Sequence, residues 1–277
     1  MAIVNTHYGF CAKGGALNFT YTGEYNVRDD GVVELLTSGT ITFLRPAVID
    51  LFMVGGGSSG RSGYTSSIFG CGGGAGGYTQ TVRKFKAVAN NGYTVTIGAG
   101  GSPNPFGNPH GNPGGITSFG TFTVNGGSIT PGNSSYIASG YSGGSGGGGG
   151  VSKNSGYGAG GSDGANGEQG YSSSDPVPGG NGQNSTTREF GEPTGKLYAG
   201  GGGGGRYLRS QSPVLSMGGS GGGGTGGWCG GGIVTRAATA GGANTGGGGG
   251  GGAVNTSASY VNGAPGGSGI VCFRAAK

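Results

Sequence analysis

Charged side chains are scarce in this chain. Only 10 acidic and 15 basic residues occur among 277, so charged residues make up 9% of the sequence, well below the roughly one quarter found in ordinary soluble proteins. Disordered chains usually stay soluble through high charge, which is missing here. The net charge of +5 is spread thinly, with one cluster at Arg83–Lys86, and repeated Arg-Gly-Gly triplets are absent. The composition therefore argues against a nucleic-acid-binding surface.

Long apolar runs are also missing. The longest, Val48–Val54, contains Asp50 and is too short to span a bilayer. The first fifteen residues lack a basic stretch followed by an apolar run, so we expect no secretory signal and synthesis in the cytoplasm.

Recognisable catalytic and metal-binding patterns are absent as well. The two histidines, His7 and His110, are not close in sequence to a carboxylate, and the four cysteines are widely separated without a C-x-x-C motif. We therefore expect no metal, no cofactor and no enzymatic activity. The cysteines are interpreted as buried thiols, with a Cys71–Cys229 disulfide left open as an alternative.

What the chain has in excess is glycine. Seventy-nine glycines occur, many of them in tracts at 143–150, 200–205, 218–224, 226–232 and 246–252. Such tracts are either flexible linkers or segments that pack against one another. Their similar lengths, the varied sequence between them and the strand-like Gly269–Arg274 at the end of the chain favour packing.

Packed glycine tracts would adopt the extended left-handed polyglycine-II helix. This helix has three residues per turn and no internal hydrogen bonds, so its N–H and C=O groups point sideways. Buried groups of this kind need partners, and neighbouring tracts can supply them because no side chains keep the backbones apart. We expect the second half of the chain to form such a bundle.

The first half has a different pattern, with short alternating apolar and polar segments separated by turns. The continuous apolar run Ala47–Val54 predicts a strand that is buried on both faces. No segment shows helical periodicity, so we expect an all-β module, a sandwich or jelly roll. The other predicted strands are Leu17–Tyr21, Val32–Leu36, Gly39–Leu44, Tyr78–Arg83, Tyr93–Gly98 and Phe119–Val124.

The junctions between strands and glycine tracts resemble the glycine-rich domain of bacteriophage and prophage tail and fibre proteins. The motifs that carry the resemblance are Ser38–Phe43, Val48–Gly57, Gly72–Tyr78, Tyr93–Gly101 and Gly266–Arg274. The resemblance covers residues 38–277 and implies a β-sandwich (strands within about 38–140 and 268–274) interleaved with a polyglycine-II bundle (about 141–267). Residues 1–37 match nothing in this pattern and are interpreted as a possible attachment region.

A looser similarity to the tail-fibre tip adhesins of T-even-like phages implies that loops between glycine helices bind the host. Aromatic and cationic side chains in these loops suit sugars or protein loops. The predicted receptor-binding residues are Tyr157, Tyr171, Phe190, Tyr198, Arg206, Tyr207 and Arg209.

The predicted function is that of a structural protein of the phage tail or fibre, located on the virion surface, which binds a host receptor. Its expected partners are other virion proteins and a bacterial surface glycan or outer-surface protein, with a homo-oligomer as a further possibility. Two alternatives stay open. One is a purely structural virion component or filament subunit, and the other is an enzyme that acts on surface glycans.

Overall fold

The computed structural model describes residues 5–8, 17–63, 69–108, 110–131, 139–150, 166–167, 187–208, 216–230, 235–256 and 259–277. The described chain is all-β, with several antiparallel sheets, none of which closes into a barrel. One short 3-10 helix, η2 (Glu189–Gly191), interrupts this pattern. Among the described residues there is no helix with the length and apolarity that crossing a membrane requires.

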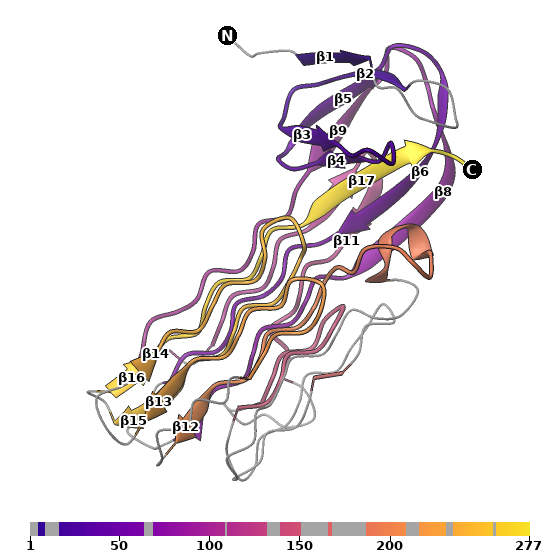
Figure 1. The fold of residues 1–277 in the computed structure, drawn as a ribbon. Helices are drawn as coiled ribbons and strands as arrows, with labels where there is room; N and C mark the ends of the chain where they lie inside the picture. Colours follow the sequence, from indigo (N-terminus) through magenta and orange to yellow (C-terminus); the bar gives the residue numbers. More distant parts are fainter. Residues whose placement is uncertain are drawn as a thin grey trace.

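Two sheets pack face to face at one end of the molecule and form what we call the sandwich (Figure 1). The first sheet has the strand order β1-β2-β5-β9-β10-β11 and the second the order β3-β4-β17-β6-β8. The strands of the first sheet are β1 (Asn5–Tyr8), β2 (Asn18–Tyr21), β5 (Gly39–Phe43), β9 (Gly92–Thr96), β10 (Thr117–Phe119) and β11 (Phe122–Val124). Those of the second are β3 (Tyr25–Val27), β4 (Val33–Leu35), β6 (Ala47–Val54), β8 (Thr79–Ala87) and β17 (Ile270–Ala275).

Aromatic rings fill the space between the two sheets. Phe273 of β17 packs against Phe19 and Phe43 of the other sheet, with ring centroids 5.4 and 5.8 Å apart. All three side chains are buried, so burial of apolar surface stabilises this half of the molecule in the ordinary way.

The last strand of the chain lies in the middle of its sheet. β17 pairs with β6 from Ile270↔Val54 to Ala275↔Ile49 and with β4 on its other side. The C-terminal segment therefore closes the sandwich between two strands from the beginning of the chain, and the strand-like character of Gly269–Arg274 is confirmed.

Beyond the sandwich, extended glycine segments run side by side and form what we call the plate (Figure 1). Its described segments are 55–63, 70–77, 98–101, 140–150, 200–205, 216–227, 239–252 and 263–269. The segments 55–63, 70–77 and 200–205 and the tract 246–252 are buried throughout. All of the plate segments hydrogen-bond to one another through their backbones. The predicted packing of the tracts is confirmed for these residues.

The hydrogen bonds of the tract 246–252 show how the plate is held together. Its N–H groups at 248 and 251 donate to the segment 200–205, those at 249 and 252 to the segment 55–63, and the one at 250 to Thr239. These donor–acceptor distances are 2.9–3.0 Å. Its carbonyl groups accept bonds from 71–77 (at 246, 249 and 252), from 264–267 (at 247 and 250) and from 224–227 (at 248 and 251). One tract thus bonds to five other segments and to Thr239 of its own segment, and each of the five is reached again after three residues.

Two small sheets close the end of the plate that lies far from the sandwich, which we call the tip (Figure 1). One contains β12 (Arg206–Leu208), β13 (Trp228–Gly230) and β14 (Thr235–Arg236), and the other contains β7 (Phe69–Gly70), β15 (Ala253–Thr256) and β16 (Ser259–Val261). The sequence did not predict these short strands, and β1 and β3 were missed too.

Three expectations about organisation need correction. Strand β2 belongs to the first sheet of the sandwich, and strands β3 and β4 belong to the second. Residues before position 37 are therefore part of the sandwich and do not form a separate unit. The plate includes 55–63 and 70–77, so the glycine bundle is not confined to residues 141–267. Finally, Phe119–Val124 is a hairpin rather than one strand, because Gly120 has a φ of +57° and turns the chain between β10 and β11.

Candidate functional site at the tip

Four of the seven predicted receptor-binding side chains cannot be placed. Tyr157, Tyr171 and Arg209 lie outside the described residues. Tyr207 lies in β12 at the tip, where its backbone pairs with Cys229 of β13, but its side chain also falls outside the described part.

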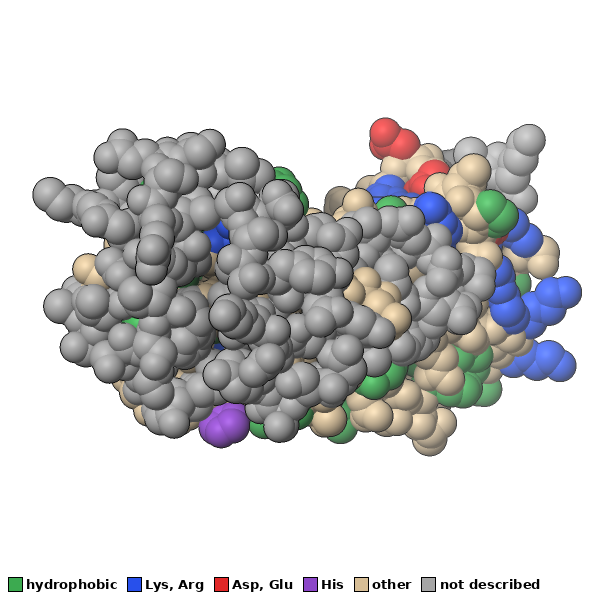
Figure 2. All heavy atoms as spheres, turned by 90° about the horizontal axis from the view of Figure 1, so that it is seen from below, with side chains coloured by type: hydrophobic (Ala, Val, Ile, Leu, Met, Phe, Trp, Pro, Cys, Tyr) green, Lys and Arg blue, Asp and Glu red, His purple; other side chains and the backbone are tan. Residues whose placement is uncertain are grey.

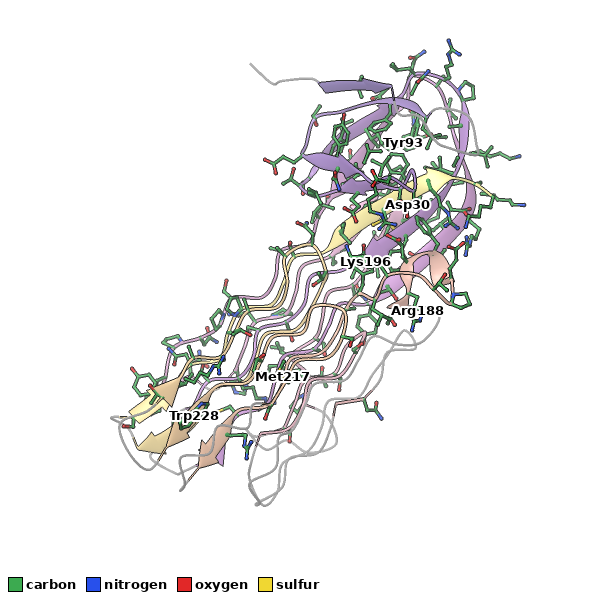
Figure 3. The ribbon with its side chains drawn as sticks, viewed as in Figure 1. Asp30, Tyr93, Arg188, Lys196, Met217 and Trp228 are labelled. Carbon is green, nitrogen blue, oxygen red and sulfur yellow. The ribbon has the colours of Figure 1, made fainter. Side chains whose placement is uncertain are left out.

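Phe190 and Tyr198 lie at the sandwich end rather than at the tip, and both are buried. Their exposed fractions are 1% and 0%, and their rings pack on Phe52 with centroid distances of 6.2 and 5.3 Å. Figure 3 shows two residues of the same segment, Arg188 and Lys196, beside the sandwich and far from Trp228 at the tip. These aromatic side chains therefore belong to the core, and their assignment to a receptor surface is corrected.

The segment 187–198, which we call the latch, fastens the plate to the sandwich through ion pairs. Glu189 accepts two hydrogen bonds from Arg28 at 2.8 and 2.7 Å. Glu192 accepts two from Arg274 at 2.9 and 2.6 Å and one from Lys277 at 2.8 Å. Paired geometry of this kind gives stronger bonds than single neutral ones. The hydrogen bonds to Arg274 and Lys277 lower the pKa of Glu192 to about 2.

Three buried groups near the latch carry atoms of the kinds that ligate metal ions. The ligand atoms of Glu34, Glu189 and Cys272 all lie within 4.8 Å of one another. However, Arg28 bonds to both carboxylates, and burial raises the pKa of the Cys272 thiol well above its ordinary value. A cation is already present, and the protonated thiol is a poor ligand. The arrangement fits an ion-pair cluster better than a metal centre.

Arg206 and Trp228 face each other across β12 and β13 at the tip. Both side chains are buried, with exposed fractions of 1% and 6%. Arg206 therefore supports the tip from inside, which corrects its assignment as a receptor contact. Trp228 also lies at the tip (Figure 3).

A second buried arginine lies where the plate meets the tip. The guanidinium of Arg61 lies 4.4 Å above the ring of Tyr141 and is 1% exposed. Burial lowers the pKa of Arg61 and raises that of the neighbouring Cys71 thiol to about 12. Cys71 and Cys229 are buried and form no disulfide, which agrees with the buried-thiol interpretation. Cys11 lies outside the described residues.

Acidic and basic residues are distributed unequally along the molecule. In the described part of the chain every carboxylate side chain belongs to the sandwich or the latch, namely Glu24, Asp29, Asp30, Glu34, Asp50, Glu189 and Glu192. The described tip contains Arg206 and Arg236 but no acidic residue, and the plate adds Arg61 beside it. The acidic side chains visible in Figure 2 lie at the sandwich end.

Sequence reasoning missed one exposed aromatic feature of the tip. Tyr260 in β16 is 42% exposed, and its ring stacks on Phe106 with a centroid distance of 4.4 Å and an interplanar angle of 27°. The signal available in the sequence was weak: Phe106 lies in a proline-punctuated loop and Tyr260 in a short alternating segment after the last tract.

Comparison with known proteins gives one family match. Residues 36–276 match the model of a family described as a glycine-rich domain. No curated protein is similar enough in sequence to match the chain.

Proposed function

Because the chain belongs to the glycine-rich domain family, we propose that it is a rigid attachment module of a phage tail or fibre that recognises a bacterial receptor with its tip. In this proposal the sandwich connects to other virion proteins, and the tip contacts a surface glycan or an outer-surface protein. The module binds its receptor without chemical change, from a position on the virion surface.

The first support is the stiffness that the plate's hydrogen bonds imply. The tract 246–252 bonds to five other segments, and each of these segments is reached again after three residues. A helix with three residues per turn directs its polar groups in this way. We therefore interpret the tracts as polyglycine-II helices in a mutually bonded bundle, which holds the tip at a fixed distance from the sandwich.

The observation that carries the proposal is the separation of the two ends. Strand β1 and residues 276–277 lie at the sandwich end, and β12–β16 lie at the opposite end of the plate (Figure 1). Functional loops are usually those presented by a rigid scaffold. A chain fastened through its sandwich would therefore present the tip outward.

The alternative of a purely structural virion component, or of a filament subunit, has its own support. Val48 and Val88 in and beside the strands of the second sheet are 46% and 61% exposed, and apolar surface of this kind is suited to contact between subunits. In that case the protein would assemble with itself or with other virion proteins and would not adsorb to cells.

A blocking experiment tests which end makes contact with the cell. In a Cys11→Ser background, one added cysteine (Thr235→Cys at the tip or Val88→Cys at the sandwich) is coupled to a bulky polyethylene glycol maleimide. Cys71, Cys229 and Cys272 are buried and should not react. We expect unlabelled protein to adsorb to a susceptible strain in a panel of bacteria, the tip label to abolish adsorption and the sandwich label to leave it intact.

Two results would contradict the attachment proposal. The first is adsorption that is blocked by the label at 88 and not by the label at 235. The second is the absence of adsorption to any strain combined with concentration-dependent assembly in light scattering, which would favour the structural alternative.

A further inference from the structure

We propose that the tip carries a binding groove for a neutral carbohydrate, with Tyr260 as its stacking platform. The groove lies between the segment that follows β14 and the segment that contains β16. Its volume is about 440 Å³. Its lining residues are Thr235, Ala237, Ala238, Ala240 and Tyr260–Pro265. This inference rests on the proposed function, because it names the class of receptor that the tip would bind.

The exposed aromatic ring is the first argument. Tyr260 is the only aromatic side chain among the exposed large hydrophobic residues of the described chain. Exposing such a ring forgoes the stabilisation that burial would give. A tyrosine offers both a flat apolar face and a hydroxyl group, a combination that matches the apolar face and hydroxyl rim of a sugar ring.

The ring is also held in place before any ligand arrives. Tyr260 stacks on Phe106, and the loop that carries Phe106 is fixed to the plate by the bond from Gly107 N–H to the Gly63 carbonyl (3.0 Å). Within the loop, Asn112 donates to the Ser102 carbonyl at 2.7 Å. A platform that is ordered in the free protein loses less entropy on binding.

The lining supplies polar groups without charge. Asn262 is exposed, and its amide makes no hydrogen bond within the described part of the chain, so it is available as donor and acceptor for sugar hydroxyls. Thr235 adds a hydroxyl group, whereas Arg236 does not line the groove. A neutral ligand therefore fits better than an acidic polysaccharide, which would need the guanidinium.

The floor and the size of the groove favour a small ligand. A Cβ at Gly263 would lie 2.4 Å from the Gly60 carbonyl oxygen, so backbone packed against backbone closes the bottom. Ligand pockets have volumes of roughly 300–1,000 Å³, a range that includes this groove. Specific protein partners bury much larger surfaces, so one or two sugar rings match the groove better than a folded partner.

The edges of two sheets border the groove. In the described tip, β14 and β16 are edge strands of their respective sheets, so backbone groups at the rim are free of strand partners on that side. Hydrogen bonds from these backbone N–H and C=O groups would fix the orientation of a sugar bound on Tyr260. They would also pair with an extended peptide, which the experiment treats as a separate outcome.

Calorimetric titration of the full chain tests the inference. The probes are maltotriose, cellotriose, a β1,3-linked galactose trisaccharide and the N-acetylglucosamine trimer, each titrated to millimolar concentration. We expect saturable binding of at least one. Removal of the ring in Tyr260→Ala should weaken the affinity for that sugar by about tenfold or more, as for a central aromatic contact. Tyr260→Phe should retain most of the affinity.

The variant Asn262→Ala distinguishes a loss of sugar binding from a loss of folded structure. This residue is exposed, so the variant should melt at the wild-type temperature and still bind several-fold more weakly. Arg236→Ala is the matched control for charge, because Arg236 lies outside the lining, and its affinity for the sugar should equal that of the wild type.

The outcomes separate this inference from the attachment proposal. No saturable binding to any probe, unchanged affinity in Tyr260→Ala, or binding of an unstructured peptide in place of the sugars would overturn the carbohydrate groove. If cells are still adsorbed through the tip in that case, the attachment proposal stands. Conversely, sugar binding without adsorption to cells would support the groove and contradict the attachment role.

Discussion

At the residue scale, the glycines of the plate are required because a Cβ would strike a neighbouring backbone. At Gly248 the added Cβ would lie 2.2 Å from the Gly74 carbonyl oxygen, and at Gly250 it would lie 1.9 Å from that of Thr225. These neighbours are backbone atoms bonded to further segments, so they cannot turn aside as a flexible side chain can. The cost is that of overpacking a dense interior.

We predict that Gly248→Ala lowers the free energy of unfolding by about 3 kcal/mol or more, with Gly248→Val worse. The matched control is Gly92→Ala in β9, where the nearest atom is a threonine methyl group at 3.2 Å and the position is exposed. Thermal melts of the three variants compare the effects. Equal melting temperatures for Gly248→Ala and wild type would show that the tracts do not pack closely.

A second residue-scale prediction concerns the buried guanidinium of Arg61. In the described part of the chain its Nε and Nη2 have no hydrogen-bond partner, and burial of a charge without a counter-ion is costly. Replacing a buried charge with an apolar side chain of similar size is often neutral or stabilising. We therefore expect Arg61→Met to melt at or above the wild-type temperature, whereas a drop of several degrees would mean that the charge has a partner in the folded protein.

At the element scale, the latch lies in the sequence between the plate segments 140–150 and 200–205, and it is bonded to β17, the central strand of the second sheet. Arg274 of β17 bonds to Glu192 and lies 4.1 Å above the ring of Phe190. Lys196 extends from the other end of the latch toward Glu34 of β4. The latch is therefore held by ion pairs at Glu189, Glu192 and Lys196 and by the packing of Phe190 and Tyr198 on Phe52.

This arrangement predicts acid sensitivity. The pKa of Glu192 is lowered from 4.5 to about 2 in the folded protein, so its contribution to stability is fully present above the unfolded pKa and is lost as the pH falls through the folded value. We expect Glu192→Gln to cost about 1 kcal/mol at pH 7, a difference that disappears near pH 2. Urea unfolding from pH 7 to pH 2 measures it. Glu24→Gln, at an exposed carboxylate, is the control and should parallel the wild type throughout.

The sequence predicts elements well where the pattern is local. The strand Ala47–Val54 has the predicted bounds because an apolar run ends abruptly at Gly55. The hairpin at 117–124 was missed because the positive φ of Gly120 leaves no mark on an alternating pattern. The strands of the tip have two to four residues each, too few to show a periodic pattern. Two of their pairings, β12 with β13 and β7 with β15, join segments far apart in the sequence.

The candidate site was harder to predict for a related reason. Composition identifies aromatic and cationic residues, but it does not say whether their side chains are buried or exposed to solvent. Phe190 and Arg206 are buried, although each stands in a connecting segment rich in polar residues. Tyr260 is exposed because it lies on an edge strand stacked over Phe106, a placement that depends on a contact between residues 154 positions apart.

At the scale of the whole molecule, two kinds of interior are joined in one body. The sandwich is stabilised by buried aromatic and aliphatic side chains, whereas the plate is stabilised by backbone hydrogen bonds with few side chains. Cooperative unfolding of both is expected, since the tracts 55–63 and 70–77 continue directly from β6 and into β8.

Amide hydrogen exchange tests this coupling. We expect the amides at 248–252 to exchange as slowly as those of β17, because these residues are buried and each N–H donates to a backbone carbonyl. A synthetic peptide of residues 244–254 has none of these neighbours and should exchange within seconds. Equally fast exchange in the full chain would identify the plate as a flexible linker and remove the basis of the attachment proposal.

The recurrence of partners after every third residue in 246–252 has an evolutionary consequence. Inserting one or two glycines would rotate all following N–H groups away from their acceptors, whereas inserting three would restore the original directions one turn further on. Tracts of natural homologues should therefore differ in length by multiples of three, with matching changes in the tracts beside them. The length of the plate would then change between homologues in discrete steps, and its width would stay constant.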